Sequence, residues 1–292
     1  MAAAEGSERR VVRMAKKKAI VERLLQEGFF SCKEKALPYV MSGAVLCGGV
    51  PVQKAGQLVP QEFPITVRGL HDRYVGKGGY KLEGAIADFG ITVKERICID
   101  AGACTGGFTD CFVQQGAALV YAVEVGFRQL AGSLAQHPHV VNLEKTNLSD
   151  EKLLTLMPLA TLGSVDLSYL SLVRAVPQFR AIMRKQGELL CLVKPLFETE
   201  DSVARRTGEI AEAEYVPLLL RLIAELNQQP ETHVHGVTHS HVTGNHGTHE
   251  FFLHIKFGEA LQRPRDWLRE AEAAVQCALA LPRYQKAGKE LG

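Results

Sequence analysis

The sequence predicts an α/β fold in which a doubly wound, mostly parallel sheet follows a small α+β module. From residue 81 onward, apolar strand-like segments alternate with segments of helical periodicity, an order typical of parallel sheets. The 292 residues are 46% hydrophobic, enough to bury a substantial core. Residues 1–81 carry a net charge of +7 (14 Lys/Arg, 7 Asp/Glu), and the remainder carries −5 (20 and 25). This asymmetry favours a basic module that meets a polyanion, with a merely solubilising N-terminus as the alternative.

The first eighty residues predict a separate small domain. Apolar residues at helical spacing begin a helix near Ala19, and Ser31 with Glu34 forms a capping box for a second helix. Gly48–Gly49 marks a hairpin, and two further short strands follow it. The predicted boundaries are a flexible basic arm at 1–18, the small α+β domain at 19–67, a linker at 68–80 and the main domain at 81–292.

The main domain predicts seven strands and a helix in most of the connections between them. The expected strands are 97–100, 119–125, 140–143, 164–167, 189–194, 233–238 and 250–257. The expected helices are 82–89, 108–115, 128–135, 173–183, 211–227 and the amphipathic segment 265–281. In such a sheet, ligands bind at the carboxyl ends of the strands.

The cysteines and the hydropathy profile exclude several classes of protein. Seven cysteines lie scattered through apolar runs without a C-x-x-C pair, which indicates reduced thiols and neither a disulfide framework nor a zinc site. No apolar run is long enough to span a bilayer, and the N-terminus lacks the apolar core of a signal peptide. We expect a soluble, cytoplasmic protein without stable membrane association.

A glycine-rich turn follows the first strand of the main domain, in the run I-C-I-D-A-G-A-C-T-G-G-F. Gly102 lets the backbone pass close to a ligand, and Gly106 keeps the start of the next helix accessible. Glu124 ends the following strand, where its carboxylate can accept hydrogen bonds from ribose hydroxyls. Cys104 stands where a dinucleotide-binding turn has its second glycine, so that class is excluded. Asp100 at the strand end favours an adenosine cofactor that carries positive charge.

Four charged residues fall where a doubly wound sheet places its chemistry. Asp166 and Lys194 lie at the ends of two of the predicted strands, Glu250 begins another, and Lys81 precedes the first helix. Lys194 directly follows an apolar run, and partial burial lowers the pKa of a lysine towards values useful for proton transfer. For each residue taken alone, a surface salt bridge is the alternative.

Seven of the ten histidines lie between His233 and His254. The pairs H-V-H and H-S-H place imidazoles on one face of a strand, a geometry that can hold a divalent metal. We nevertheless interpret the cluster as the composition of a surface loop, and we expect no metal site there.

Several of these segments together resemble the TlyA (hemolysin A) family of FtsJ-like ribosomal RNA 2′-O-methyltransferases. The motifs are G-G-Y-K-L, D-A-G-A-C-T-G-G-F-T-D, V-Y-A-V-E-V-G-F-R-Q-L, E-K-T-N, V-D-L-S-Y-L-S-L, L-V-K-P-L-F-E and H-E-F-F-L-H-I, in the order of that family across residues 20–257. The run S-C-K-E-K-A-L-P-Y-V-M-S-G-A-V resembles its N-terminal S4-type RNA-binding domain.

The resemblance implies a class I methyltransferase fold, S-adenosylmethionine as cofactor and ribosomal RNA or ribosomal subunits as partner. It implies a catalytic tetrad of Lys81, Asp166, Lys194 and Glu250, in which Lys194 deprotonates or steers a ribose 2′-hydroxyl without a metal, and by family analogy the ribose is that of a cytidine. It also implies cofactor contacts from Asp100, Gly102, Gly106, Phe108, Glu124 and Asn147.

The chain departs from the family pattern at several positions, but the tetrad is intact. K-K-K-A-I-V-E-R-L and S-C-K replace family signatures of the RNA-binding domain, Glu124 replaces an aspartate, and Cys104 replaces a serine. Two alternative functions remain at this point. One is a membrane-active hemolysin, as the older family name suggests, and the other is an RNA-binding protein whose methyltransferase fold is vestigial.

Overall fold

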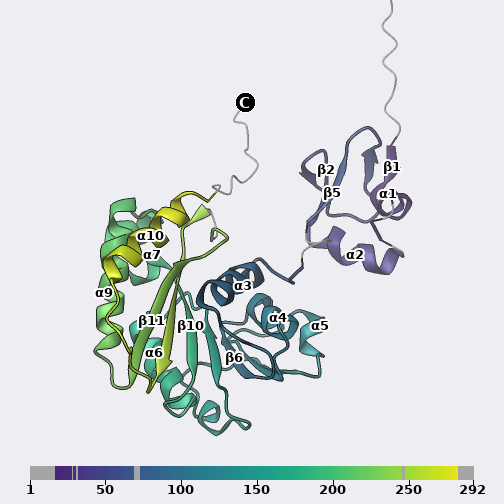
Figure 1. Cartoon of the computed structure of the whole chain (residues 1–292). Coiled ribbons are helices and arrows are strands. Elements are labelled where there is room, and N and C mark those ends of the chain that lie inside the picture. The colour runs from purple at the N-terminus through teal and green to yellow at the C-terminus, as the bar shows by residue number, and fades with distance from the viewer. Residues whose placement is uncertain (1–16, 28, 31, 69–72, 245–246, 282–292) are drawn as a thin grey trace, which may run out of the picture. The chain divides into compact units, whose positions relative to one another are not determined.

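The chain folds into two compact units, Met1–Arg73 and Tyr74–Gly292 (Figure 1). The structure is a computed structural model, and it describes residues 17–27, 29–30, 32–68, 73–244 and 247–281. Within these ranges, no helix is both long and apolar enough to cross a membrane.

The N-terminal unit is a small α+β module, as the sequence predicts. It comprises β1 (Lys17–Ala19), α1 (Ile20–Gln26), α2 (Lys33–Met41), β2 (Val45–Cys47), β3 (Val50–Pro51), β4 (Leu58–Pro60) and β5 (Ile65–Val67). The hairpin β2–β3 turns at Gly48–Gly49, and β2 also pairs with β5, while β1 pairs with β4. The predicted cap Ser31 lies outside the described residues, and Lys17 and Lys18, assigned to the arm, belong to β1.

One side chain holds the loop after β4 in the N-terminal unit. The guanidinium of Arg23 is buried and pairs with Glu27. It also donates hydrogen bonds of 2.7 Å to the Pro60 carbonyl and 3.1 Å to the Phe63 carbonyl. A buried arginine is tolerated because each of these acceptors offsets part of the cost of removing its charge from water.

The C-terminal unit contains a seven-stranded sheet in the order β11-β12-β10-β9-β6-β7-β8. Five neighbouring strands, β10, β9, β6, β7 and β8, are parallel to one another. Strand β12 is antiparallel to both of its neighbours, β10 and β11. The strands are β6 (Ile97–Ala101), β7 (Leu119–Val123), β8 (Val140–Leu143), β9 (Leu162–Val165), β10 (Glu188–Val193), β11 (Thr232–His239) and β12 (Phe251–Phe257). The prediction of a doubly wound, mostly parallel sheet is therefore confirmed.

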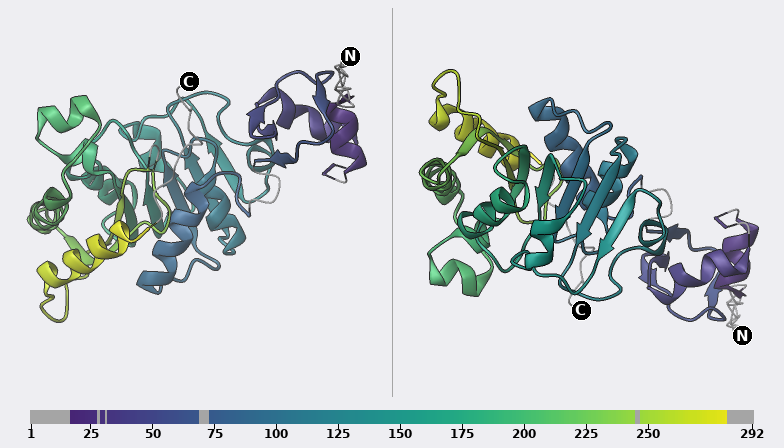
Figure 2. Two further views of the ribbon diagram at one scale, coloured as in Figure 1. Left: turned by 90° about the horizontal axis from the view of Figure 1, so that it is seen from above. Right: turned by 90° about the horizontal axis from the view of Figure 1, so that it is seen from below.

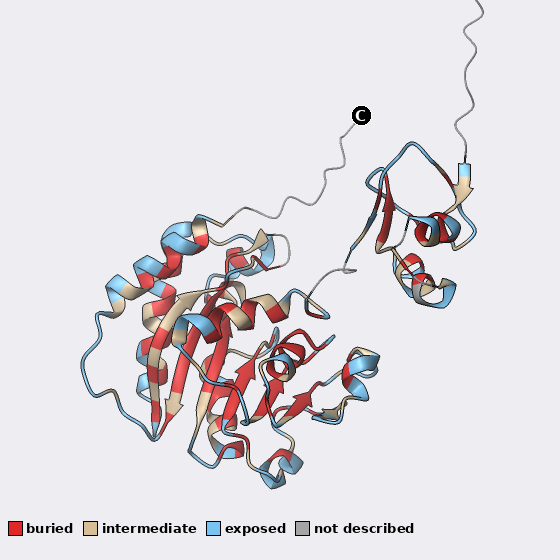
Figure 3. Ribbon diagram, turned by 45° about the vertical axis from the view of Figure 1, so that its right-hand side comes forward, coloured by how far each residue is buried: buried red, intermediate tan, exposed pale blue. Residues whose placement is uncertain are grey.

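Helices cover both faces of this sheet (Figure 2). One face packs against α3 (Gly78–Phe89) and α4 (Gly107–Gln114), and the other against α6 (Leu172–Ile182), α9 (Tyr215–Asn227) and α10 (Trp267–Leu279). The short helices are α5 (Gly132–Ala135), α7 (Pro195–Glu198), α8 (Ser202–Thr207) and the 3-10 turns Glu151–Thr155 and Glu212–Glu214. The strands are buried along most of their length, because helices shield them from both sides (Figure 3).

The structure differs from the sequence prediction at several helix and strand boundaries. Helix α3 begins at Gly78, inside the predicted linker, and in its first turn a Cβ at Gly79 would lie 2.2 Å from the Tyr74 ring. Strand β9 begins at Leu162, two residues before the predicted start, and it ends before Asp166. Its start was not predicted because glycine, here Gly163, is unfavourable in strands. The predicted helix 128–135 shortens to α5, because Arg128 adopts a left-handed φ of 55°. Helices α7 and α8 were not predicted.

The strand order reverses between β6 and β9. From β6 the chain continues outward to β7 and β8, and it then returns to place β9 on the other side of β6. The loops at the carboxyl ends of these two strands therefore diverge and leave a crevice, the position where doubly wound sheets bind their ligands.

Candidate functional site

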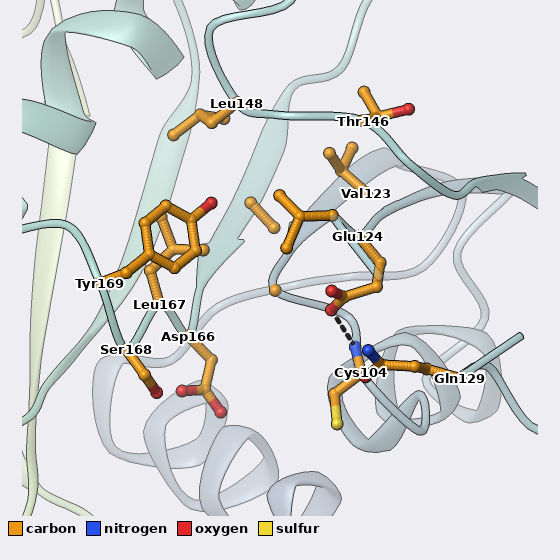
Figure 4. A pocket seen from close by; sticks show the side chains of 13 residues that line it. Cys104, Val123, Glu124, Gln129, Thr146, Leu148, Asp166, Leu167, Ser168 and Tyr169 are labelled. Atoms are coloured by element: carbon orange, nitrogen blue, oxygen red, sulfur yellow. Dashed lines mark hydrogen bonds between the residues drawn. The ribbon is translucent and has the colours of Figure 1, made fainter. Parts of the chain in front are cut away.

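A cavity of about 210 Å³ opens at this crevice (Figure 4). That volume is many times what a single water needs, so the cavity is of ligand size. Its walls come from the ends of β6, β7 and β9 and from the loop after β8. The lining residues are Ala101, Gly102, Cys104, Val123, Glu124, Val125, Gln129, Thr146, Leu148, Asp166, Leu167, Ser168 and Tyr169.

Glu124 ties the glycine-rich turn to the end of β7. Its carboxylate accepts a hydrogen bond of 2.9 Å from the backbone N–H of Cys104 (Figure 4). It accepts another, of 2.7 Å, from the N–H of Gly126. The side chain lines the cavity although it is mostly buried. Each carboxylate oxygen can accept a second hydrogen bond, so Glu124 can hold the turn and still bind hydroxyl donors of a ligand.

Gly102 is required for a reason that the sequence did not reveal. Its φ is +86°, and a Cβ there would lie 2.2 Å from the carbonyl oxygen of Asp166. Since Ala101 pairs with Val165 in register, Gly102 and Asp166 are neighbours just beyond the ends of β6 and β9. The sequence interpretation assigned the close approach to a ligand, but in the structure the close neighbour is the backbone of Asp166.

Gly106 is likewise explained by protein packing. It begins α4 with a φ of +99°, and a Cβ would lie 2.4 Å from a methyl group of Leu134 and 2.7 Å from one of Leu130. The absent side chain therefore makes room for two leucines. Gly106 is not among the residues that line the cavity.

Asp100 lies behind the turn and does not line the cavity. It is fully buried, and its two carboxylate oxygens accept hydrogen bonds from the hydroxyls of Thr109 (2.7 Å) and Ser164 (2.9 Å). Asp100 was expected to face a cationic cofactor; in the structure its side chain links β6 to α4 and β9, and a cofactor contact stays a prediction. Burial raises the pKa of Asp100 to about 6, although both hydrogen bonds oppose the shift.

We expect Asp100→Asn to remove a pH-dependent loss of stability. Because the pKa of Asp100 is higher in the folded state than in the unfolded chain, the folded state binds the proton more tightly, and stability falls as pH rises from about 4 to 6. A shift of roughly 2 units corresponds to about 3 kcal/mol. Urea denaturation of both proteins from pH 4 to 7 measures this. If the difference between their free energies of unfolding stays constant across that range, the assignment is wrong.

Two other predicted cofactor residues are placed away from the cavity. Phe108 is buried in the core, where its ring stacks on Phe252 with centroids 6.0 Å apart. Asn147 is exposed, and its side-chain oxygen accepts hydrogen bonds of 3.1 Å from the N–H and the hydroxyl of Ser149. Its neighbours Thr146 and Leu148 line the cavity instead. The short E-K-T-N motif thus lies in a loop that lines the cavity, whereas Asn147 itself is not among the lining residues, and its contact with a cofactor stays a prediction.

The four charged residues form two ion pairs at the same edge of the sheet. Lys81 Nζ lies 2.5 Å from Glu250 Oε2, and both side chains are buried. Lys194 pairs with Asp166 and donates a 2.9 Å hydrogen bond to the hydroxyl of Ser168. Lys194 is partly buried, as the sequence predicted, so neither pair is a freely solvated surface salt bridge.

Strand register explains why these pairs lie together. Val193 of β10 pairs with Phe251 of β12, so Lys194 and Glu250 stand opposite each other one step beyond the paired residues. Asp166 stands one step beyond the end of β9, the other neighbour of β10. The edge that carries the cavity therefore also carries the four charged side chains.

Sequence reasoning missed several residues of the cavity wall. Ser168 and Tyr169 come two and three residues after Asp166, and Gln129 lies in the loop after β7. Their positions in the sequence could have identified them, because each lies within a few residues of the end of a predicted strand. Burial raises the pKa of the Tyr169 hydroxyl, and the nearby Glu124 carboxylate adds to the shift. The Tyr169 hydroxyl therefore stays protonated near neutral pH and can donate a hydrogen bond.

Comparisons with known proteins agree with this arrangement. The model of the FtsJ-like methyltransferase family matches residues 74–257. The 16S/23S rRNA (cytidine-2′-O)-methyltransferase TlyA of Mycobacterium tuberculosis is 33% identical over 249 residues, which cover 83% of this chain and 91% of that protein. Hemolysin A of Brachyspira hyodysenteriae is 34% identical over 191 residues, 65% of this chain and 79% of the relative. A solved structure from Streptococcus thermophilus, named for a hemolysin, is 31% identical with a TM-score of 0.65, and the match covers 89% of this chain and 95% of that one.

Proposed function

Because this chain belongs to the family of FtsJ-like methyltransferases, we propose that it methylates a ribose 2′-hydroxyl of ribosomal RNA, with S-adenosylmethionine as the methyl donor. The observation that carries the proposal is the Lys194–Asp166 pair at the rim of a ligand-sized cavity. The name of the Mycobacterium tuberculosis relative supports a cytidine as the modified nucleotide.

The chemistry of the cavity wall fits this cofactor. Val123, Val125, Leu148 and Leu167 supply apolar surface for a flat base, and carboxylates flank it at Glu124 and Asp166. We assign Glu124 to the ribose hydroxyls, because its oxygens retain acceptor capacity after the two backbone hydrogen bonds. Asp166 provides negative charge near a cationic sulfonium. When bound, S-adenosylmethionine supplies an electrophilic methyl group.

The tetrad supplies proton handling and orientation. Lys194 first releases its own proton to solvent and, as the neutral amine, accepts the proton of the 2′-hydroxyl; Asp166 then stabilises the ammonium that forms again, since the two groups are in contact. Ser168 fixes the direction of the lysine side chain through its 2.9 Å hydrogen bond. The buried pair Lys81–Glu250 lies on the other side of Lys194 from Asp166, because Glu250 stands opposite Lys194 just beyond the paired residues of β10 and β12. Orientation and a preset electrostatic environment are the main sources of rate enhancement in such a site.

Positive charge next to the tetrad supports a polyanionic substrate. Lys77 lies one helical turn before Lys81 and donates a 3.3 Å hydrogen bond to the Thr243 carbonyl. Burial and the charge of Lys81 lower the pKa of Lys77, as expected where two ammonium groups are held near each other. An RNA phosphate would relieve this repulsion. We further propose that the N-terminal unit acts as an S4-type RNA-binding domain, because its excess of basic residues provides salt-dependent affinity for phosphates.

The function is tested by mapping 2′-O-methyl groups on ribosomal RNA. RNA from cells that contain the gene is compared with RNA from cells that lack it, and purified protein with S-adenosylmethionine is then added to the unmodified RNA or subunits. We expect at least one ribose to gain a 2′-O-methyl group both in cells and in vitro. Identical methylation maps in the two strains, with no transfer in vitro, would reject the proposal in favour of a protein that binds RNA without modifying it.

A further inference from the structure

The structure joins two of the histidines noted in the sequence to an aspartate from a distant helix. His239 ends β11, His241 follows two residues later, and Asp88 lies near the end of α3. One ligand atom from each of the three lies within 4.8 Å of the other two. The Nε2 atom of His241 is 2.9 Å from Oδ2 of Asp88, and the two imidazole rings stack with centroids 4.7 Å apart.

Neighbouring residues hold this arrangement in place. Gly84, in the middle of α3, leaves room for the His241 ring, since a Cβ there would lie 2.6 Å from its Cγ. Glycine is unfavourable inside a helix, so its presence there is explained by the ring that it admits. The hydroxyl of Thr238 donates a 2.5 Å hydrogen bond to Oδ2 of Asp88. Such outer contacts orient the ligands of metal sites.

We propose that Asp88, His239 and His241 bind a divalent transition metal of the Zn²⁺ type. Two imidazoles and one carboxylate are a ligand set that suits such ions. The 2.9 Å between His241 Nε2 and Asp88 Oδ2 is about 0.5 Å less than the ~3.4 Å between adjacent ligands of a tetrahedral ion with bonds of about 2.1 Å, so a small side-chain rotation would admit the ion. His239 must move closer by a side-chain rotation. Asp88 and His241 are open to solvent, so an ion can enter and water can complete its coordination.

The ion would connect the two elements that carry the Lys81–Glu250 pair. Asp88 and Lys81 lie two turns apart on α3, and so on the same side of that helix. Ser240, between the two histidines, donates a 2.8 Å backbone hydrogen bond to the carbonyl of Glu250. A metal bound here therefore fastens α3 to the β11–β12 turn and stabilises the pair from outside the cavity. The proposal goes beyond the proposed methyl transfer and does not require that function.

Metal binding by the full chain, without an affinity tag, tests the proposal. Zn²⁺ is titrated in competition with a chromophoric chelator, and we expect one tight site in the wild type. Asp88→Asn and His241→Ala should each weaken that site at least tenfold. His137→Ala is the matched control, because His137 and His139 are also an H-x-H pair, with ring centroids 5.6 Å apart, for which the described residues offer no third ligand. It should bind Zn²⁺ as the wild type does.

A further variant tests the arrangement without removing a ligand. Gly84→Ala displaces the His241 ring, while alanine favours the helix, so the variant should fold and lose the tight site. The melting temperature measured with and without Zn²⁺ supplies a second readout, and only proteins with the site intact should be stabilised by the ion. Absence of tight binding in the wild type would overturn the proposal. So would unchanged binding in His241→Ala, or an equal loss in His137→Ala.

Discussion

Lys194→Ala should reduce methyl transfer by roughly 10²- to 10⁴-fold while the protein still binds S-adenosylmethionine. The substitution removes the amine that receives the proton and leaves Asp166 without its partner. Glu124 and the apolar walls, which we assign to the cofactor, are untouched. Single-turnover transfer to ribosomal RNA measures the rate, and calorimetric titration measures cofactor affinity. Transfer at the wild-type rate would exclude Lys194 from the reaction.

Two further variants separate the roles of this lysine. Lys194→Arg keeps the positive charge but cannot lose its proton near neutral pH, so it should be as inactive as the alanine variant if Lys194 is the base. Substantial activity in Lys194→Arg would instead indicate that the cation only steers the hydroxyl. Lys152→Ala is the matched control, because Lys152 is also paired with an aspartate, Asp150, but at the exposed surface. It should leave the rate unchanged.

Gly102→Ala should both destabilise the protein and abolish transfer. The new Cβ would lie 2.2 Å from the carbonyl oxygen of Asp166, and the left-handed φ of +86° is unfavourable for alanine. Neither backbone segment can move away without disturbing the sheet, because both directly follow paired strands. We expect a loss of about 2 kcal/mol or more in the free energy of unfolding, measured by urea denaturation.

Gly90→Ala is the control that separates the effect of backbone strain from the effect of a steric clash with Asp166. Gly90 also has a left-handed φ, +63°, but nothing lies within 4 Å of a Cβ built there. The free energy of unfolding of this variant should fall by only roughly 1 kcal/mol, the cost of the backbone strain, and the variant should remain active. If Gly102→Ala lowers the free energy of unfolding no more than Gly90→Ala does, then the close approach of the Asp166 carbonyl is not the reason for the glycine at position 102.

The sheet and the positions of the charged residues could be predicted because both depend on local sequence. Apolar segments such as I-C-I and L-L-C-L-V identify strands, and in a parallel sheet the ends of neighbouring strands meet at one edge. The sequence therefore places Lys194 and Asp166 at the same edge of the sheet. The helices α7 and α8 were missed because they are too short to show a helical period.

The roles of Asp100 and Gly102 could not be predicted, because they depend on residues distant in the sequence. Ser164, which binds Asp100, is 64 residues away, and so is the Asp166 carbonyl that excludes a side chain at position 102. Asp88 was missed at the metal site for the same reason, since 153 residues separate it from His241. A pattern read along the chain does not contain these neighbours, whereas strand order and register supply them.

The position of β12 has a consequence for the order in which the protein is completed during synthesis. This strand inserts between β10 and β11, although it is the last strand of the sheet to leave the ribosome. Until then Lys81, near the start of the domain, lacks the carboxylate of Glu250 that lies 169 residues further along. A nascent chain would have to bury an uncompensated ammonium group to close its catalytic edge, which is strongly unfavourable. The edge of the sheet that carries the cavity is therefore completed only after nearly the whole domain has been translated.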